Sequence, residues 1–284
     1  PSWSIMPLMP SLSWLLLVTG GYPLWRAWQG NRETALLQAI NWAIIAWAAW
    51  LWALFPGRVW PEAAEVRYLA LSLTGCAMVA VLGARRPGVG AWNFVVLGLL
   101  AILLVPLAES LITGRSLRPG PARLVFLGGT VAVGILNYLP TRSALGAVLL
   151  GAGCAGEMRL FAGSAFPLPG VEEMDSLGQW LLGLALWGAY VRSRWRPAPP
   201  AEFDQLWLSF RDRFGLFWGQ RLREQFNRSA AHAGWPVFLR WQGLRLTGPR
   251  PGPAEQTAMV GVLRALLKRF GPPDSPGPVA RGSV

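Results

Sequence analysis

The sequence predicts an all-α, polytopic membrane protein of about seven transmembrane helices, followed by a small amphipathic α or α/β tail. Only 14% of the 284 residues are charged, whereas soluble domains carry roughly 25%. The mean hydropathy is +0.36. Apolar runs close to the length of a bilayer span, about 20 residues, recur along the first two thirds of the chain. Together these observations favour a bilayer protein over a soluble one.

The apolar runs place the expected helices. The clearest begins at Thr34 and stops at Pro56-Gly57, and the weakest is the first, which three prolines interrupt. Only residues 140–142 separate the fifth and sixth helices, so these should form a tight antiparallel hairpin. We expect transmembrane helices at about 6–25, 34–55, 66–84, 91–112, 122–139, 143–163 and 176–192.

The charges are unevenly divided along the chain. Residues 1–191 carry 11 arginines and 8 acidic groups, whereas residues 192–284 carry 15 basic and 6 acidic groups. The 164–175 loop is acidic and lacks Lys and Arg, while arginines cluster at 192–196. Because basic residues favour the cytoplasmic side, we expect a multi-pass protein of the bacterial cytoplasmic (inner) membrane with a cytoplasmic C-terminus.

The chain divides into four parts on composition. The transmembrane bundle covers 1–192, and a stiff proline-containing hinge covers 193–200. A basic amphipathic tail follows at 201–270. The Pro/Gly-rich end, 271–284, is expected to be disordered.

The tail should contain two amphipathic helices, at about 201–232 and 254–270, around a strand-like stretch with a turn at Gln242-Gly243. Three interpretations of the first helix stay open. The favoured one lays its apolar face on the membrane surface, with arginines on anionic lipid. In the second, the face packs on the strand and second helix. In the third, it enters a partner's groove. A nucleic-acid platform is not expected, because the aromatics share one helix face. The residues of this face and its flank are Phe203, Trp207, Phe210, Arg211, Arg213, Phe214 and Phe217.

Small residues recur every four positions in the sixth helix, at Ser143, Ala147, Gly151 and Ala155. Such a small-xxx-small stripe lets a neighbouring helix approach closely. Glycines of the fifth helix could supply the facing surface: Gly128, Gly129 and Gly134.

Polar residues within membrane helices are the default functional candidates. Here they are Glu109, Asn137, Glu157 and Arg159. Most lie within two turns of a helix end, where an interfacial or capping role is the simpler interpretation. Glu157 and Arg159 are two residues apart, so they should not pair within one helix.

Trp47 and Trp50 lie deeper in the second helix, three residues apart on one face. They are weak candidates to wall a site for a pigment, a quinone or a lipid. The simpler interpretation is that they face lipid or another subunit.

The composition also limits the chemistry. The single histidine, His232, is in the tail, and Cys76 and Cys154 lie in apolar runs. The membrane part alone therefore offers no ligand set for haem, zinc or copper. No catalytic set or nucleotide loop is recognisable, so we expect no catalytic residue, no metal and no required cofactor.

The leading hypothesis is accordingly a non-enzymatic subunit of a larger membrane complex. Its partners would be membrane lipids and other membrane subunits, and the tail would bind the membrane surface or a partner. The alternative is a transporter or lipid-handling protein with a pocket near Asn137, Glu109 and Glu157. An enzyme acting on lipid ranks third.

Overall fold

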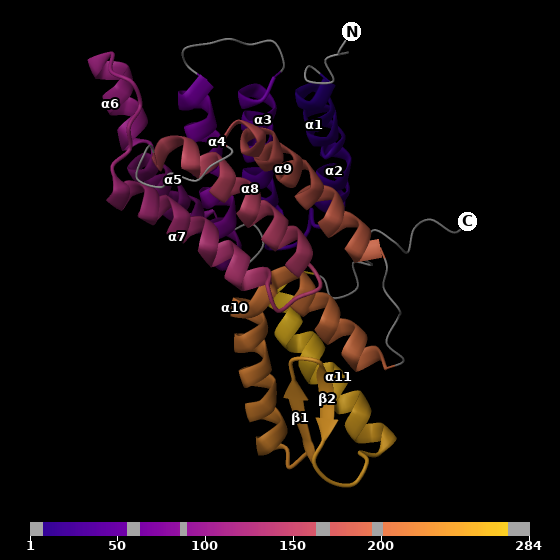
Figure 1. The fold of residues 1–284 in the computed structure, drawn as a ribbon. Coiled ribbons are helices and arrows are strands. Elements are labelled where there is room, and N and C mark those ends of the chain that lie inside the picture. Colours follow the sequence, from indigo (N-terminus) through magenta and orange to yellow (C-terminus); the bar gives the residue numbers. More distant parts are fainter. Residues whose placement is uncertain (1–7, 56–62, 86–89, 163–170, 195–200, 272–284) are drawn as a thin grey trace.

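The computed structural model describes residues 8–55, 63–85, 90–162, 171–194 and 201–271. It is a bundle of apolar helices with a smaller domain, formed by the C-terminal tail, attached at one end (Figure 1). The described part of the first 192 residues is helical, as expected, and the described part of the tail combines helices with a two-stranded sheet.

The first half of the bundle follows the apolar runs, but its helices are shorter than predicted. The first run is divided between α1 and α2 at Gly20, and the fourth between α5 and α6 at Leu104. Pro106 lies in the first turn of α6, where its missing N–H costs nothing. The bounds are Leu8–Thr19 for α1, Gly21–Gly30 for α2, Leu37–Ala53 for α3, Ala63–Ala80 for α4 with the 3-10 turn η1 at Val81–Gly83, Ala91–Leu103 for α5, and Val105–Thr113 for α6.

The second half consists of α7 (Pro121–Tyr138), α8 (Ala144–Ala162) and α9 (Val171–Arg194). α7 starts with proline at its first position, after Gly120 in an extended conformation. The turn between α7 and α8 spans only residues 139–143, which confirms the predicted tight hairpin.

The structure does not show the seven or so membrane spans that the sequence predicts. Three of the described helices are long and apolar enough to cross a bilayer: Ala64–Gly83, Pro121–Tyr138 and Ala144–Ala162. The α5–α6 pair, bent by 42°, would add a fourth if it counts as one span. α3 is apolar but has only 17 residues, the lower limit for a span. Of the two remaining expected spans, the first is shortened by the break at Gly20, and the seventh, α9, is not among the described helices long and apolar enough to cross a bilayer.

α8 packs most closely on α9. A Cβ added at Gly146 would lie 2.9 Å from Ala189 Cβ and 3.1 Å from the Ala185 carbonyl oxygen. A Cβ at Gly153 would lie 3.1 Å from the Gly178 carbonyl oxygen. Glycine is therefore needed at both positions for the backbones to approach.

The small-residue stripe predicted in the sixth helix is thus only partly at this interface. Ala147 is buried, but Ala155 is exposed. Gly151 faces Ile135 of α7, and Gly134 faces Met78 of α4. Gly128 faces Met158 of α8, whereas a Cβ at Gly129 would meet nothing. The positions that pack closely on α9 are Gly146 and Gly153, whereas Gly151 of the predicted stripe packs on α7.

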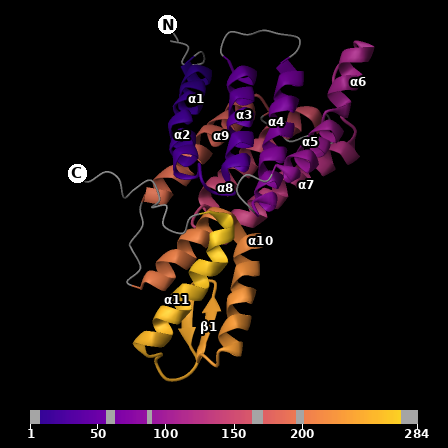
Figure 2. The same cartoon turned by 180° about the vertical axis from the view of Figure 1, so that it is seen from behind.

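The tail forms a small α/β domain from α10 (Glu202–His232), a β-hairpin and α11 (Pro253–Leu267), which ends in the 3-10 turn η3 (Lys268–Phe270). Strand β1 (Val237–Arg240) pairs antiparallel with β2 (Gly243–Leu246), in the register Arg240↔Gly243. The expected strand and turn are confirmed. α11 lies alongside α10 (Figure 2).

An apolar core holds the tail domain together. Phe203 packs edge-on against Phe226, with ring centroids 4.9 Å apart. Asn227 secures the hairpin to α10, since it accepts a bond from the Leu239 amide (2.7 Å) and donates one to the Leu239 carbonyl (3.1 Å). The buried members of this core are Phe203, Trp207, Phe210, Phe214, Leu222, Phe226, Leu239, Met259, Leu263, Leu267 and Phe270.

The remaining boundary predictions fall largely outside the described residues. Of the expected hinge, 193–200, only Ser193 and Arg194 are described, and they continue α9. Of the Pro/Gly-rich end, 271–284, only Gly271 is described.

Candidate functional site

The tail meets the bundle at a break in α10. Gly215 has φ 78° and ψ −165°, which only glycine adopts without strain. The break exposes backbone groups on either side. The Asn137 side chain, at the end of α7, accepts a hydrogen bond from the Phe217 amide (2.9 Å) and donates one to the Phe214 carbonyl (3.4 Å). Asn137 thus replaces the helical bonds lost at the break.

The α7–α8 turn makes further polar contacts with the tail. The Tyr138 hydroxyl donates to the Arg213 carbonyl (2.9 Å). The Asp212 carboxylate accepts from the backbone amide of Arg142 (3.3 Å) and forms an ion pair with the Arg142 side chain (3.6 Å). Trp241, in the β-hairpin turn, donates its indole N–H to the Pro140 carbonyl (2.7 Å). The turn is therefore held by both α10 and the hairpin.

Arg211 connects these contacts inside the tail. Its guanidinium donates to Asp212 Oδ1 (2.7 Å from Nη2) and to the Trp241 carbonyl (2.8 Å from Nη1). Arg211 and Asp212 are both buried, and a buried charge needs such partners. Arg211 orients Asp212 and Trp241, the two tail residues that contact the α7–α8 turn.

Two other segments at the same end of the bundle also contact the tail. The Trp218 indole N–H donates to the Val81 carbonyl in η1, after α4 (3.2 Å). The Ala35 amide, between α2 and α3, donates to the Phe270 carbonyl at the end of the tail domain (2.8 Å). The tail therefore joins three bundle segments that are distant in sequence.

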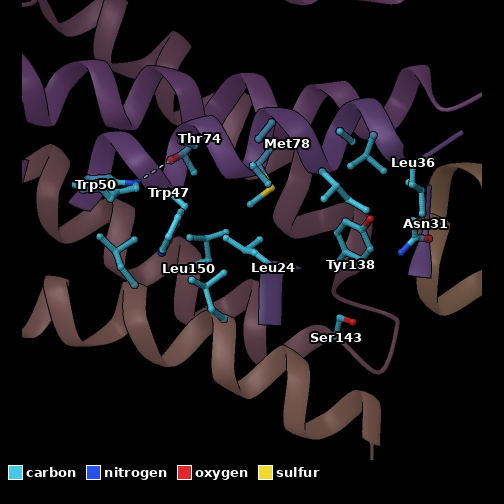
Figure 3. A pocket seen from close by; sticks show the side chains of 18 of the residues that line it. Leu24, Asn31, Leu36, Trp47, Trp50, Thr74, Met78, Tyr138, Ser143 and Leu150 are labelled. Carbon is cyan, nitrogen blue, oxygen red and sulfur yellow. Dashed lines mark hydrogen bonds between the residues drawn. The ribbon is translucent and has the colours of Figure 1, made fainter. Parts of the chain in front are cut away.

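A cavity of about 350 Å³ lies within the bundle and reaches this junction (Figure 3). Small-molecule pockets span about 300–1,000 Å³. Its walls come from both halves of the bundle and from α10. Among the lining residues are Leu17, Leu36, Trp47, Trp50, Met78, Leu150 and Leu186 in the apolar part, and Asn31, Tyr138, Ser143, Asp212 and Arg213 in the polar part.

Trp47 and Trp50 lie at one end of the cavity in Figure 3, and Asn31, Tyr138 and Ser143 lie toward the other. The Trp47 indole N–H donates to the Leu17 carbonyl (2.8 Å), and that of Trp50 donates to Thr74 Oγ1 (3.0 Å). Both ring N–H groups are used by the protein, so the rings offer the cavity apolar surface. The prediction that these tryptophans could wall a site is consistent with this geometry.

The polar candidates from the sequence do not come together in this cavity. Glu109 pairs with Arg123 (2.6 Å), and both side chains are largely exposed. Glu157, only 2% exposed, lies 3.5 Å from Arg67 of α4. Asn137 holds the α10 break, and none of the three acidic or amide candidates lines the cavity. Arg159 is half-buried near the end of α8 and does not line it either.

The aromatic face of α10 is mostly internal. Phe203, Trp207, Phe210 and Phe214 are buried in the tail core, which favours the small-domain interpretation over the membrane-surface one for these four residues. Phe217 differs, because it follows the break and is 41% exposed. Arg211 is buried rather than available to lipid, whereas Arg213 lines the cavity.

Sequence reasoning gave no site role to Gly215, Asp212, Trp218 or Trp241. The available signal was a glycine in the middle of an aromatic stripe whose phase fails soon afterwards, at Arg221. Within the described residues, no group of three or more His, Cys, Asp or Glu side chains could hold a metal ion.

Comparisons with known proteins do not identify the chain. No protein-family model, no curated protein and no solved structure matches it. The site must therefore be interpreted from its own chemistry.

Proposed function

We propose that this chain is a multi-pass membrane protein that binds an amphiphile within its helix bundle and closes the polar end of the binding cavity with its C-terminal tail. The observation that supports this most directly is the cavity itself. Its walls are apolar around Trp47 and Trp50, and its tail end carries Asp212 and Arg213.

The distribution of polar groups favours an amphiphile over a wholly polar ligand. Because the indole N–H groups of Trp47 and Trp50 already bond Leu17 and Thr74, the deep part presents mainly carbon surface. Burial of an acyl chain, an isoprenoid chain or an aromatic ring there would gain roughly 25 cal/mol per Å². A polar head would lie among Asn31, Ser143 and Arg213. Lipids, quinones and pigments all share this chemistry.

The cavity can be tested by filling it. Ala43 lies on α3 and lines the cavity, whereas Ala48 lies on the same helix with its side chain exposed. The probe is a fatty acid carrying a doxyl group, which quenches nearby tryptophan fluorescence. We expect saturable quenching in the purified protein, loss of that component in Ala43→Phe, and its retention in Ala48→Phe. Saturable quenching that persists in Ala43→Phe would place the binding elsewhere.

The proposal also places the chain in a bacterial cytoplasmic membrane with its tail in the cytoplasm. The net charge of +12 resides mainly in the tail, and basic segments favour the cytoplasmic side. A reporter enzyme fused after Val284 should be active only in the cytoplasm. Activity of that fusion in the periplasm would show that the tail lies there and that the proposed orientation is wrong.

A role as a subunit of a larger membrane complex is the second candidate. It is favoured by α6, which extends away from the rest of the bundle (Figure 1) and exposes Leu111 (69%) and Ile112 (85%). Contiguous exposed apolar surface of this kind is covered by lipid or by another protein. The double variant Leu111→Ser/Ile112→Ser should reduce the native mass of the detergent-extracted particle if a partner covers α6. An unchanged mass would argue that lipid covers it.

A further inference from the structure

A group of three arginines lies where the tail domain meets the end of α4. Arg85 follows η1, Arg221 lies on α10, and Arg269 lies in η3. Among the described residues, no carboxylate forms an ion pair with any of the three. Arg269 donates to the neutral side chain of Gln225 (3.0 Å). Within the described residues, the group is therefore a concentration of positive charge that no acidic side chain pairs with.

Aromatic rings hold two of these side chains. The Arg221 guanidinium lies 5.0 Å from the Phe217 ring centroid and 5.6 Å from that of Trp218. Arg269 lies 4.8 Å from the ring of Phe270. Trp218 and Phe270 are themselves packed together, with centroids 5.3 Å apart. Cation–π contacts of this kind orient the guanidinium groups while leaving their N–H donors available.

The position of the group relative to the bilayer follows from α4. The apolar stretch Ala64–Gly83 is one of the helices long enough to cross a membrane, and Arg85 comes two residues after it. Trp218 bonds the carbonyl of Val81 near the end of that stretch. Arg221, one turn beyond Trp218 on α10, is thereby held close to the level at which a span would leave the hydrocarbon. Phe217, 41% exposed, lies beside it.

We propose that Arg85, Arg221 and Arg269 form a binding site for the phosphate of an anionic membrane lipid, at the junction between the tail domain and the bundle. Arginine presents several donors in a fixed plane, which suits phosphate oxygens. The exposed ring of Phe217 suits the adjoining headgroup and glycerol region. The site differs from the cavity, because none of its three arginines lines that cavity.

The electrostatics of Arg269 agree with this site. Burial lowers the pKa of its guanidinium below the usual value, and the neighbouring charges of Arg85 and Arg221 lower it further. A bound phosphate would relieve that repulsion. The inference rests on the membrane placement proposed above, but not on binding of an amphiphile in the cavity.

The test is a native mass spectrometry titration of the full chain in a nonionic detergent, with short-chain phosphatidylglycerol as the probe. Short-chain phosphatidylcholine and inorganic phosphate are the comparison arms. The triple variant Arg85→Gln/Arg221→Gln/Arg269→Gln should bind phosphatidylglycerol on the order of 100-fold more weakly, at about fivefold per arginine. The matched control Arg228→Gln/Arg245→Gln/Arg250→Gln removes three exposed tail arginines outside the group and should bind as the parent does.

Several results would overturn the proposal. Equal weakening in the control triple would show that only net charge matters. Binding of phosphatidylcholine, or of inorganic phosphate, as tight as that of phosphatidylglycerol would exclude an anionic lipid as the specific ligand. If the triple variant does not fold, the single variants Arg85→Gln and Arg221→Gln replace it, since both side chains are exposed. Phosphatidylglycerol binding that is unchanged in both single variants overturns the site. Release of the parent chain from membranes at alkaline pH would overturn the membrane placement as well.

Discussion

The side chain of Asn137 occupies the space that any side chain at position 215 would need. A Cβ built on Gly215 would lie 2.2 Å from Asn137 Nδ2 and 2.6 Å from Asn137 Cγ. The backbone conformation and the close approach of α7 therefore require glycine for two independent reasons. Asn137 and Gly215 thus form a close contact between the bundle and the tail.

Gly215→Ala should destabilise the docked tail. Backbone strain at positive φ costs about 1–3 kcal/mol, and displacement of Asn137 adds the loss of its two hydrogen bonds. We expect a lower Tm and faster proteolysis within the tail. Gly234→Ala is the matched control, because Gly234 also has positive φ (66°) but a Cβ there meets nothing within 4 Å. Equal effects of the two substitutions would mean that strain alone matters and that Asn137 does not restrict position 215.

Trp241→Phe and Trp218→Phe should each weaken docking of the tail by about 1 kcal/mol. Each substitution keeps an aromatic ring but removes the N–H that donates to Pro140 or to Val81, and a typical hydrogen bond contributes about that much. Hydrogen exchange at residues 139–143 measures the effect. Trp14→Phe serves as control, since its indole bonds the Leu51 carbonyl within the bundle. Faster exchange in the control alone would contradict this account.

Gly153→Leu should disrupt the packing of α8 on α9, whereas Ala155→Leu should be tolerated. A side chain at position 153 meets Leu182 at 3.0 Å and the backbone of Gly178 at 3.1 Å, while Ala155 is exposed. Overpacking typically costs about 1–3 kcal/mol and can cost more where backbones are in contact. The yield and Tm of detergent-purified protein measure the difference. A larger loss for Ala155→Leu would show that position 155 faces a helix after all.

Arg67→Leu should destabilise the bundle, because it leaves the buried carboxylate of Glu157 without the partner 3.5 Å away. Loss of one member of a buried pair costs about 3–5 kcal/mol. Since Arg67 is 21% exposed, the lower end of that range is expected. The double variant Arg67→Leu/Glu157→Leu should recover most of the loss in Tm. A double variant as unstable as the single one would mean that Glu157 depends on other contacts.

The sequence located the helices well but not their lengths. Apolar runs mark every helix of the bundle, since burial in lipid or in protein requires them equally. The breaks at Gly20 and Leu104 were less visible, because both positions remain within apolar stretches. The number of predicted membrane spans depends on such breaks, and the pattern of apolar residues does not reveal where they occur.

The candidate site was predictable only in part. Trp47 and Trp50 were found because their spacing alone puts them on one face of α3. The aromatic face of α10 was found by the same reasoning. However, a periodic row of aromatic residues shows only that a helix face is apolar, and it does not show which part of the protein or membrane covers that face. Here α11 and the hairpin pack on α10, and Phe210 contacts Phe270 at the end of the tail domain. The roles of Asp212 and Trp241 depend on contacts across 70 and 101 residues, which no local pattern encodes.

The contacts of the tail with three separate bundle segments have a consequence for biogenesis. The tail is synthesised after all of the bundle helices. On the proposed membrane placement, it can bind the 31–36 segment, the end of α4 and the α7–α8 turn only if all three lie on one side of the membrane. A chain with one helix pair inserted the wrong way would leave Trp218, Trp241 or the carbonyl of Phe270 without its acceptor or donor. On the proposed membrane placement, the tail domain could therefore dock only in chains whose bundle helices had been inserted in the matching orientation.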